Sequence, residues 1–264
     1  MEQYLWLIPV GFVIGSYATL IGAGGGFVLV PVLLLLYPEE NPETIASISL
    51  AVVFFNALSG SVAYARAKRI DYKSGFIFSV GTVPGSILGA LTTPLLTRRI
   101  FDLIFGILMI VASAFLLLLP QKREQPGGDR RSHLEGEWGR PLRYNPAIGL
   151  GVGFLVGYIS GLLGIGGGFI EVPAMVYLLN FPVHIATATS QFIQVIIAFT
   201  GTATHVIGGA FQRGVRRTIS LSIGVVLGAQ LGARISGRIR GDWIIRGLAI
   251  ALAFVGVRLI AMAF

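Results

Sequence analysis

The sequence contains no cysteine and has few charged side chains. None of its 264 residues is Cys, and only 12% are Asp, Glu, Lys or Arg. Without cysteine the chain forms neither a disulfide framework nor a zinc–thiolate site. An average soluble domain carries roughly twice this charged fraction, so the composition argues against an ordinary soluble enzyme. The apolar share of 54% also excludes an intrinsically disordered chain.

What the sequence has in abundance is long uncharged runs. No Asp, Glu, Lys or Arg occurs in residues 3–38, 44–65, 74–97, 103–119, 144–170 or 185–212. A membrane-spanning helix needs about 20 mostly apolar residues, and several of these runs reach that length. We therefore predict an all-α polytopic membrane protein.

The net charge of +8 resides in the segments between these runs. Basic residues in such positions are typical of loops on the cytoplasmic side of a membrane. We therefore expect the lipid bilayer, and no nucleic acid, as a partner, with the chain passing several times through the cytoplasmic membrane. On this basis the basic segments 66–73 and 213–217 are placed inside and the acidic segment 38–43 outside.

The chain repeats itself. Residues 11–31 (GFVIGSYATLIGAGGGFVLVP) and 153–173 (GFLVGYISGLLGIGGGFIEVP) are identical at 11 of 21 positions. We divide the chain into an N-terminal transmembrane repeat (1–119), a polar cytoplasmic linker (120–146) and a C-terminal transmembrane repeat (147–264), with about four spans in each repeat. Four net crossings make the repeats parallel and five make them inverted, and the sequence leaves both arrangements open.

Glycines interrupt the first segment of each repeat. Residues 3–38 are too long for one span and too short for two, which favours a helix, an unwound stretch at Gly22–Gly26 and then a half-helix. Unwound backbone at membrane depth is tolerated only inside protein or beside a water-filled cavity. Two such breaks at matching positions indicate a transport site.

The glycine breaks have two interpretations. In the first, the N–H groups of Gly24, Gly25, Gly26, Gly166, Gly167 and Gly168 cradle an anion at the start of each half-helix. In the second, the small residues allow close helix packing, which is also what we expect of the glycines spaced by four at 81–89, 149–161 and 224–232. A dinucleotide-binding motif is excluded, because Phe27 and Phe169 stand where its third glycine belongs.

Polar side chains inside the predicted spans are the other candidates for substrate binding. They are Ser49, Asn56, Thr189, Ser190, Gln191 and Gln194. Neutral hydrogen-bond donors suit a transported oxyanion, because they bind it without the trap that a buried Arg would make. The alternative role of such residues is hydrogen bonding between helices.

Two titratable residues lie within the spans. Glu171 follows the second glycine break, and an intramembrane carboxylate is costly enough to suggest function. It carries a coupling proton, lies at a water-filled vestibule or forms a structural pair with an Arg. His205 either relays protons or is a packed, hydrogen-bonded side chain. We find no metal site, no catalytic constellation and no nucleotide motif, so we expect neither a cofactor nor an enzyme.

The duplicated Gly-x-Gly-Gly-Gly-Phe-x-x-x-Pro at 22–31 and 164–173 resembles the sulfite exporter TauE/SafE family. So does Ala186-Thr187-Ala188-Thr189-Ser190, of which Ala46-Ser47-Ile48-Ser49-Leu50 is a degenerate first copy. The resemblance implies a carrier of two repeats with small sulfur-containing anions as substrates.

We therefore expect a secondary transporter that exports sulfite by alternating access, with protons as a candidate coupling ion. The alternatives are transport of thiosulfate or C2 sulfonates in either direction, and a passive anion channel. A membrane-embedded enzyme or accessory subunit is a third class. Association into a homo-oligomer is left open.

Overall fold

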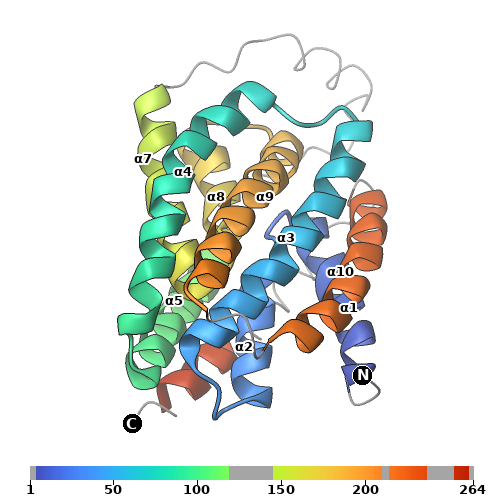
Figure 1. The fold of residues 1–264 in the computed structure, drawn as a ribbon. Coiled ribbons are helices and arrows are strands. Elements are labelled where there is room, and N and C mark those ends of the chain that lie inside the picture. The colour runs from blue at the N-terminus through green and yellow to red at the C-terminus, as the bar shows by residue number, and fades with distance from the viewer. Residues whose placement is uncertain (1–3, 119–144, 210–213, 237–252, 262–264) are drawn as a thin grey trace.

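A computed structural model describes residues 4–118, 145–209, 214–236 and 253–261 (Figure 1). These residues form helices and short connections, without a strand among them. Five helices in this part of the chain are long and apolar enough to cross a membrane. The predicted all-α polytopic membrane fold is confirmed. The predicted linker falls mostly on residues 119–144, which lie outside the described residues.

The elements follow the same order in the two halves of the chain. The first half contains α1 (Leu7–Ile21), α2 (Gly26–Leu36), α3 (Pro42–Arg66), α4 (Tyr72–Thr92) with the 3₁₀ turn η2 (Thr93–Leu95), and α5 (Arg98–Leu118). The second contains α7 (Pro146–Leu163), α8 (Gly168–Pro173) with the π-helical turn η3 (Ala174–Leu178), α9 (Val183–Ile207) and α10 (Val215–Ile235), and a helix at 253–261. A glycine break thus separates a first helix from a short second one in both halves.

Glycines spaced by four bring the first helix of each half against the fourth helix of the other half. A methyl group on Gly11 of α1 would lie 2.5 Å from the Leu221 carbonyl oxygen of α10, and one on Gly153 of α7 would lie 2.5 Å from that of Phe78 in α4. Backbones can approach this closely only where side chains are absent. The prediction that these glycine ladders serve helix packing is confirmed.

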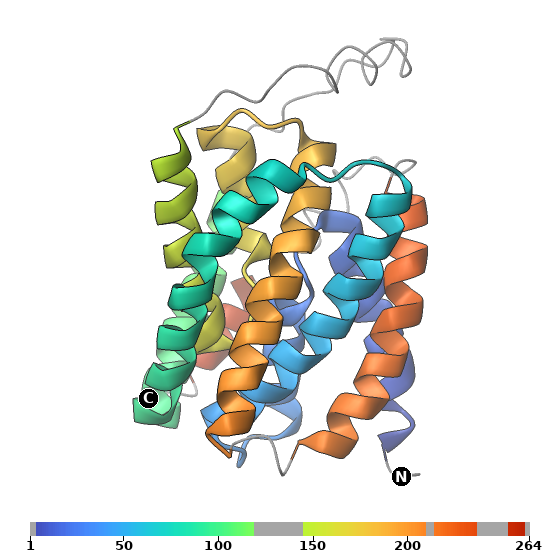
Figure 2. The same cartoon turned by 45° about the horizontal axis from the view of Figure 1, so that its top comes forward.

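The two halves run in opposite directions. Gly60 of α3 lies beside Gln191 of α9, whereas Gly201 of α9 lies beside Leu50 of α3, so α3 and α9 cross as antiparallel helices. Figures 1 and 2 show the same relation for the first helices, because α1 begins at the bottom of the bundle and α7 begins at the top. Of the two arrangements that the sequence leaves open, the structure has the inverted one.

This arrangement corrects the placement of one charged segment. An Arg217 nitrogen lies 2.7 Å from a Glu40 carboxylate oxygen, so the basic segment 213–217 shares an end of the bundle with the acidic segment 38–43. The expectation that 213–217 lies on the same side as 66–73 is wrong. Because α3 and α9 are antiparallel, the connection after α9 reaches the end where α3 begins.

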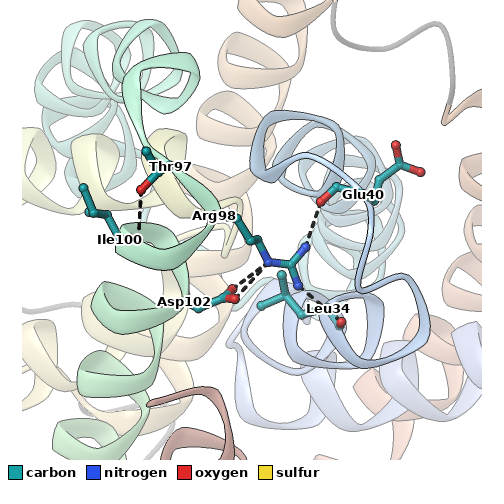
Figure 3. A network of polar contacts seen from close by, with 6 residues as sticks. All are labelled: Leu34, Glu40, Thr97, Arg98, Ile100 and Asp102. Carbon is teal, nitrogen blue, oxygen red and sulfur yellow. Dashed lines mark hydrogen bonds and ion pairs between the residues drawn. The ribbon is translucent and has the colours of Figure 1, made fainter. Parts of the chain in front are cut away.

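A polar network anchors the outer end of the half-helix α2 (Figure 3). The Arg98 guanidinium forms an ion pair with Asp102 at 2.9 Å and donates to the backbone carbonyls of Glu40 at 2.8 Å and Leu34 at 3.3 Å. Carbonyls at a helix C-terminus have no partner within the helix, and Arg98 satisfies that of Leu34. The network ties α2 to α5 at one end, while the glycine break fixes the other end of α2.

We predict that Gly15→Ala destabilises the fold. Its new methyl group would lie 2.6 Å from the Val225 Cα atom and 2.7 Å from the Val225 carbonyl oxygen, so α1 and α10 would have to separate. Overpacking of this kind costs about 1–3 kcal/mol, which corresponds to a fall in Tm of about 2–10 °C. Thermal unfolding of the purified protein in detergent measures it.

The matched control is Gly151→Ala in α7, where no atom lies within 4 Å of the added methyl group. This variant should unfold at the wild-type temperature or above it, since alanine favours a helix more than glycine does. An equal fall in Tm in the two variants would show that the contact between α1 and α10 does not require glycine at position 15.

Candidate functional site

The two glycine breaks turn the chain through left-handed backbone conformations. The φ angles are +80°, +74° and +85° at Gly22, Gly24 and Gly25, and +78°, +81° and +82° at Gly164, Gly166 and Gly167. Glycine adopts such angles without the steric cost that other residues incur. Gly22 and Gly164 thereby end α1 and α7, and α2 and α8 begin a few residues later.

The breaks lie directly against each other in the middle of the bundle. A methyl group on Gly26 would lie 2.6 Å from the Gly164 carbonyl oxygen, and one on Gly168 would lie 2.5 Å from that of Gly22. The rings of Phe27 and Phe169 stack at 5.9 Å beside this contact. Close packing is therefore one reason for the glycines.

The same breaks retain free donors, as the cradle interpretation requires. The N–H groups of Gly24–Gly26 and Gly166–Gly168 have no hydrogen-bond acceptor among the described residues. The N–H groups at a helix start have no partner within the helix, and those of α2 and α8 are buried here. Close packing and a set of unused donors thus coexist at the same positions.

Each break accepts hydrogen bonds from the half to which it does not belong. The Ser49 hydroxyl of α3 donates to the Gly164 carbonyl at 2.6 Å. On the other side, the Gly22 carbonyl accepts from the Gln194 amide of α9 at 2.8 Å and lies 3.4 Å from the Ser190 hydroxyl oxygen. Three predicted residues are therefore brought together at this contact.

Asn56 joins the same cluster through the first break. Its amide donates to the Gly24 carbonyl at 3.4 Å and its side-chain oxygen accepts from Thr19 at 3.3 Å. The Tyr64 hydroxyl in turn donates to the Thr19 carbonyl at 2.9 Å. We did not predict Thr19 or Tyr64; both are polar residues within apolar stretches, which is the signal that could have indicated them.

Glu171 lies at the second break and is fully buried. Its Oε2 atom accepts a hydrogen bond from the Ser190 hydroxyl at 2.8 Å, and Ser190 in turn accepts one from the Gln194 amide at 3.0 Å. No Arg or Lys among the described residues forms an ion pair with it. The alternative role as half of an Arg ion pair therefore has no support in the described part of the chain.

Several buried polar atoms in this cluster have no hydrogen-bond partner among the described residues. They are both amide atoms of Gln191, Oε1 of Gln194, Oε1 of Glu171 and the hydroxyl of Ser160. Leaving such an atom unpaired costs about 1–3 kcal/mol. The centre of the bundle thus holds hydrogen-bonding capacity that the described residues do not use.

Thr189 and His205 lie away from the cluster. The Thr189 hydroxyl oxygen accepts the Asp71 backbone N–H at 3.0 Å, at the start of α4, because its side chain leaves α9 on a different face from that of Ser190. His205 lies near one end of α9, with Nδ1 3.9 Å from a Glu43 oxygen. Its distance from Ser190 along the helix is about 22 Å, so it makes no direct contact with the site.

Gly25 and Gly167 are turned away from the polar side chains. A methyl group on Gly167 would lie 2.6 Å from the Val156 side chain, and one on Gly25 would lie 3.1 Å from that of Ala18. Filling the cradle by substituting Gly167 would therefore disturb the apolar core instead. Gly24 and Gly168 are the positions that face Gln194 most closely. No group of His, Asp and Glu suitable for a metal ion occurs in the described part of the chain.

The fold and the site define an all-helical polytopic membrane protein with a buried polar centre between two inverted halves. The chain belongs to the sulfite exporter TauE/SafE family, whose model matches residues 7–259.

Curated relatives of similar sequence carry general names. The probable membrane transporter protein YunE of Bacillus subtilis is 38% identical over 218 residues, which cover 78% of this chain and 80% of the relative. A probable membrane transporter protein of Xylella fastidiosa is 30% identical, over 72% of this chain and 69% of the relative. One from Methanocaldococcus jannaschii is 27% identical, over 71% and 68%. No solved structure matches the chain. The relatives are membrane transporters by name, without a stated substrate.

We predict that Gly24→Ala destabilises the contact between the breaks. The added methyl group would overlap the Gln194 amide, and the φ angle of +74° is unfavourable for alanine. We expect Tm to fall by at least about 5 °C, from strain and overlap together. The change is measured by thermal unfolding.

Gly209→Ala separates the effect of backbone strain from the effect of overlap with a neighbouring side chain. Gly209 has a similar φ angle of +83°, but no atom of the described residues lies within 4 Å of an added methyl group. It should therefore show the backbone strain alone and a smaller loss of Tm. If Gly209→Ala is as destabilising as Gly24→Ala, the overlap with Gln194 has no measurable cost.

Proposed function

We propose that the protein is a secondary transporter of small sulfur-containing oxyanions that exports sulfite across the cytoplasmic membrane by alternating access. Membership of a transporter family supports the class. The observation that carries the proposal is the fully buried Gln191, whose amide has no hydrogen-bond partner among the described residues. A substrate with several oxygen atoms would use this donor.

The chemistry of the site suits an anion that must also leave. The available donors are the Gln191 amide and the N–H groups of Gly24, Gly26, Gly166 and Gly168, which carry partial charges only. Aligned N–H groups at the start of a half-helix favour negative charge. No Arg or Lys occurs in α2, α7, α8 or α9, so in these helices the anion meets no full positive charge that would hold it too tightly to release.

The inverted halves supply a route to alternating access. Ser49 of one half binds the Gly164 carbonyl of the other, and Ser190 lies in the reciprocal position near the Gly22 carbonyl. If the halves exchange their conformations, the same contacts persist while the open end of the site changes. Inverted transporters use rocking of this kind around a fixed central site.

Coupling to protons is the remaining part of the proposal. We assign it to Glu171, which contacts Ser190 within the site, and not to His205, which lies near the end of α9 beside Glu43. The linker and the 66–73 connection would face the cytoplasm, because they carry many of the basic residues outside the runs.

Flux into proteoliposomes that contain only this protein tests the function. Sulfite, thiosulfate, sulfate and a C2 sulfonate are compared, with and without an imposed pH gradient. Saturable sulfite flux that the gradient drives uphill supports a proton-coupled carrier. Preference for thiosulfate or the sulfonate would identify that anion, in place of sulfite, as the substrate. Flux that never runs uphill would favour a passive channel. No flux of any anion would contradict the proposal.

We predict that Gln191→Leu weakens transport without harming the fold. Leucine removes two buried polar atoms that have no partner, so Tm should stay at the wild-type value or rise. The loss of one donor should raise KM for sulfite by roughly tenfold. A variant with the wild-type KM would exclude Gln191 from the substrate site.

Gln230→Leu is the matched control. The Gln230 amide donates to the carbonyl and to the hydroxyl of Ser59, both at 2.9 Å, between α10 and α3. Its loss should lower Tm by a few degrees, at about 1 kcal/mol for each net hydrogen bond, and should leave KM unchanged. Gln191→Leu should therefore raise KM without lowering Tm, whereas Gln230→Leu should lower Tm without changing KM.

A further inference from the structure

Ser190 occupies the centre of a short chain of hydrogen bonds. Its oxygen accepts from the Gln194 amide at 3.0 Å, and its hydroxyl donates to Glu171 Oε2 at 2.8 Å. A second acceptor, the Gly22 carbonyl, lies 3.4 Å away. A hydroxyl has one hydrogen to donate, and the shorter distance assigns it to the carboxylate.

The equivalent serine of the first half shows what happens without a carboxylate. The repeat places Leu29 where the second half has Glu171. The equal lengths of α3 (Pro42–Arg66) and α9 (Val183–Ile207) pair Ser49 with Ser190, one residue away from the register of the sequence comparison. Ser49 donates to the Gly164 carbonyl at 2.6 Å, whereas Ser190 stays 3.4 Å from the Gly22 carbonyl. The carboxylate of Glu171, together with the Gln194 amide that donates to the Gly22 carbonyl at 2.8 Å, accounts for the different hydrogen bonding of the two serines.

We propose that Ser190 is the relay that couples proton binding at Glu171 to anion binding at the glycine breaks. The inference rests on the proposed function and adds the coupling mechanism. While Glu171 is charged, it holds the Ser190 hydrogen, so that this hydrogen is withheld from an incoming anion. When Glu171 takes up a proton, the hydrogen bond between the two side chains reverses, and the Ser190 hydrogen becomes available to an oxyanion at the breaks.

The proton balance of this step is simple. One proton from the aqueous phase binds Glu171 Oε2, and the new O–H donates to the Ser190 oxygen. Ser190 keeps its own hydrogen, which rotates about the Cβ–Oγ bond toward Gly22. The Gln194 amide continues to donate to Ser190 and to the Gly22 carbonyl. One proton and one anion are therefore bound together, which makes the transporter a symporter. Export then runs down the outward sulfite gradient and carries a proton out, while an alkaline interior drives the same cycle inward.

The surroundings of Glu171 leave it without a competing charge. The elements packed against α8 are α7, α9, η3 and α2, whose Phe27 stacks on Phe169, and they contain neither Lys, Arg, Asp nor another Glu. Their titratable side chains are Tyr158, Tyr177, His184 and His205, of which His205 lies beside Glu43 near the end of α9. Ser190 is its hydrogen-bond partner in this part of the chain.

The test measures sulfite affinity of the purified protein from mildly acid to mildly alkaline pH, and sulfite accumulation in vesicles with an alkaline interior. Because sulfite itself titrates in this range, each variant is compared with wild type at the same pH. Wild type should accumulate sulfite uphill into the alkaline interior. Glu171→Gln, whose amide donates permanently to Ser190, should lose uphill accumulation, and its affinity should show only the pH dependence of sulfite.

Substitutions of the serine distinguish a relay from a structural role. Ser190→Ala should lower sulfite affinity by roughly tenfold and leave only the pH dependence of sulfite itself. Ser190→Thr, which keeps the hydroxyl, should restore the affinity and the pH dependence of the wild type. Ser49→Ala is the matched control, because it removes the equivalent hydroxyl from the half without a carboxylate. Its pH dependence should remain that of wild type even where its affinity falls.

Four results would overturn the relay. Wild-type pH dependence in Ser190→Ala would show that Glu171 acts without Ser190. Accumulation driven by an acid interior would show antiport. Sulfite transport that is insensitive to the pH gradient in the wild type would exclude coupling while leaving the proposed function intact. Absence of saturable wild-type flux would reject the proposed function, and the relay with it.

Discussion

The direct contact between two backbone breaks is the constraint on which the rest of the molecule depends. Gly26 approaches the Gly164 carbonyl, and Gly168 approaches that of Gly22, at distances that admit no side chain. Because the breaks touch, helices from both halves can supply hydrogen bonds to the same centre. The glycine ladders along α1, α4, α7 and α10 hold the outer helices close enough for this contact to form.

Symmetry in the backbone coexists with asymmetry in the side chains. Ser49 and Ser190 are equivalent, and so are the stacked Phe27 and Phe169. The second half alone adds Glu171, Gln191 and Gln194, where the first has Leu29, Leu50 and Val53. An inverted scaffold can exchange the conformations of its two halves. Because Glu171 belongs to the second half alone, the site has one charged side chain, in the same half, throughout this exchange. Asn56 and Thr19 contribute the polar groups of the first half.

The helical fold and the positions of the glycine breaks could be predicted from the sequence, because uncharged runs and duplicated glycines each have one main physical cause. The relative direction of the two halves could not be predicted, since the basic charge of segment 213–217 indicated the wrong side of the membrane for it. Side-chain direction was equally inaccessible: Thr189 and Ser190 are neighbours in sequence, yet one binds the start of α4 and the other Glu171. Gly167 turned out to face Val156, because a left-handed turn cannot be oriented from composition.

The account claims that the anion binds where the glycine breaks meet, beside Gln191. The most direct measurement is the anomalous scattering of selenium in crystals grown with selenite, a sulfite analogue that a chain without cysteine does not reduce through thiols. The account predicts a selenium peak where the glycine breaks meet, with the oxygen atoms of the selenite ion within roughly 3.5 Å of the Gln191 amide nitrogen. Selenite bound only to basic residues at the helix ends, such as Arg66, would contradict it.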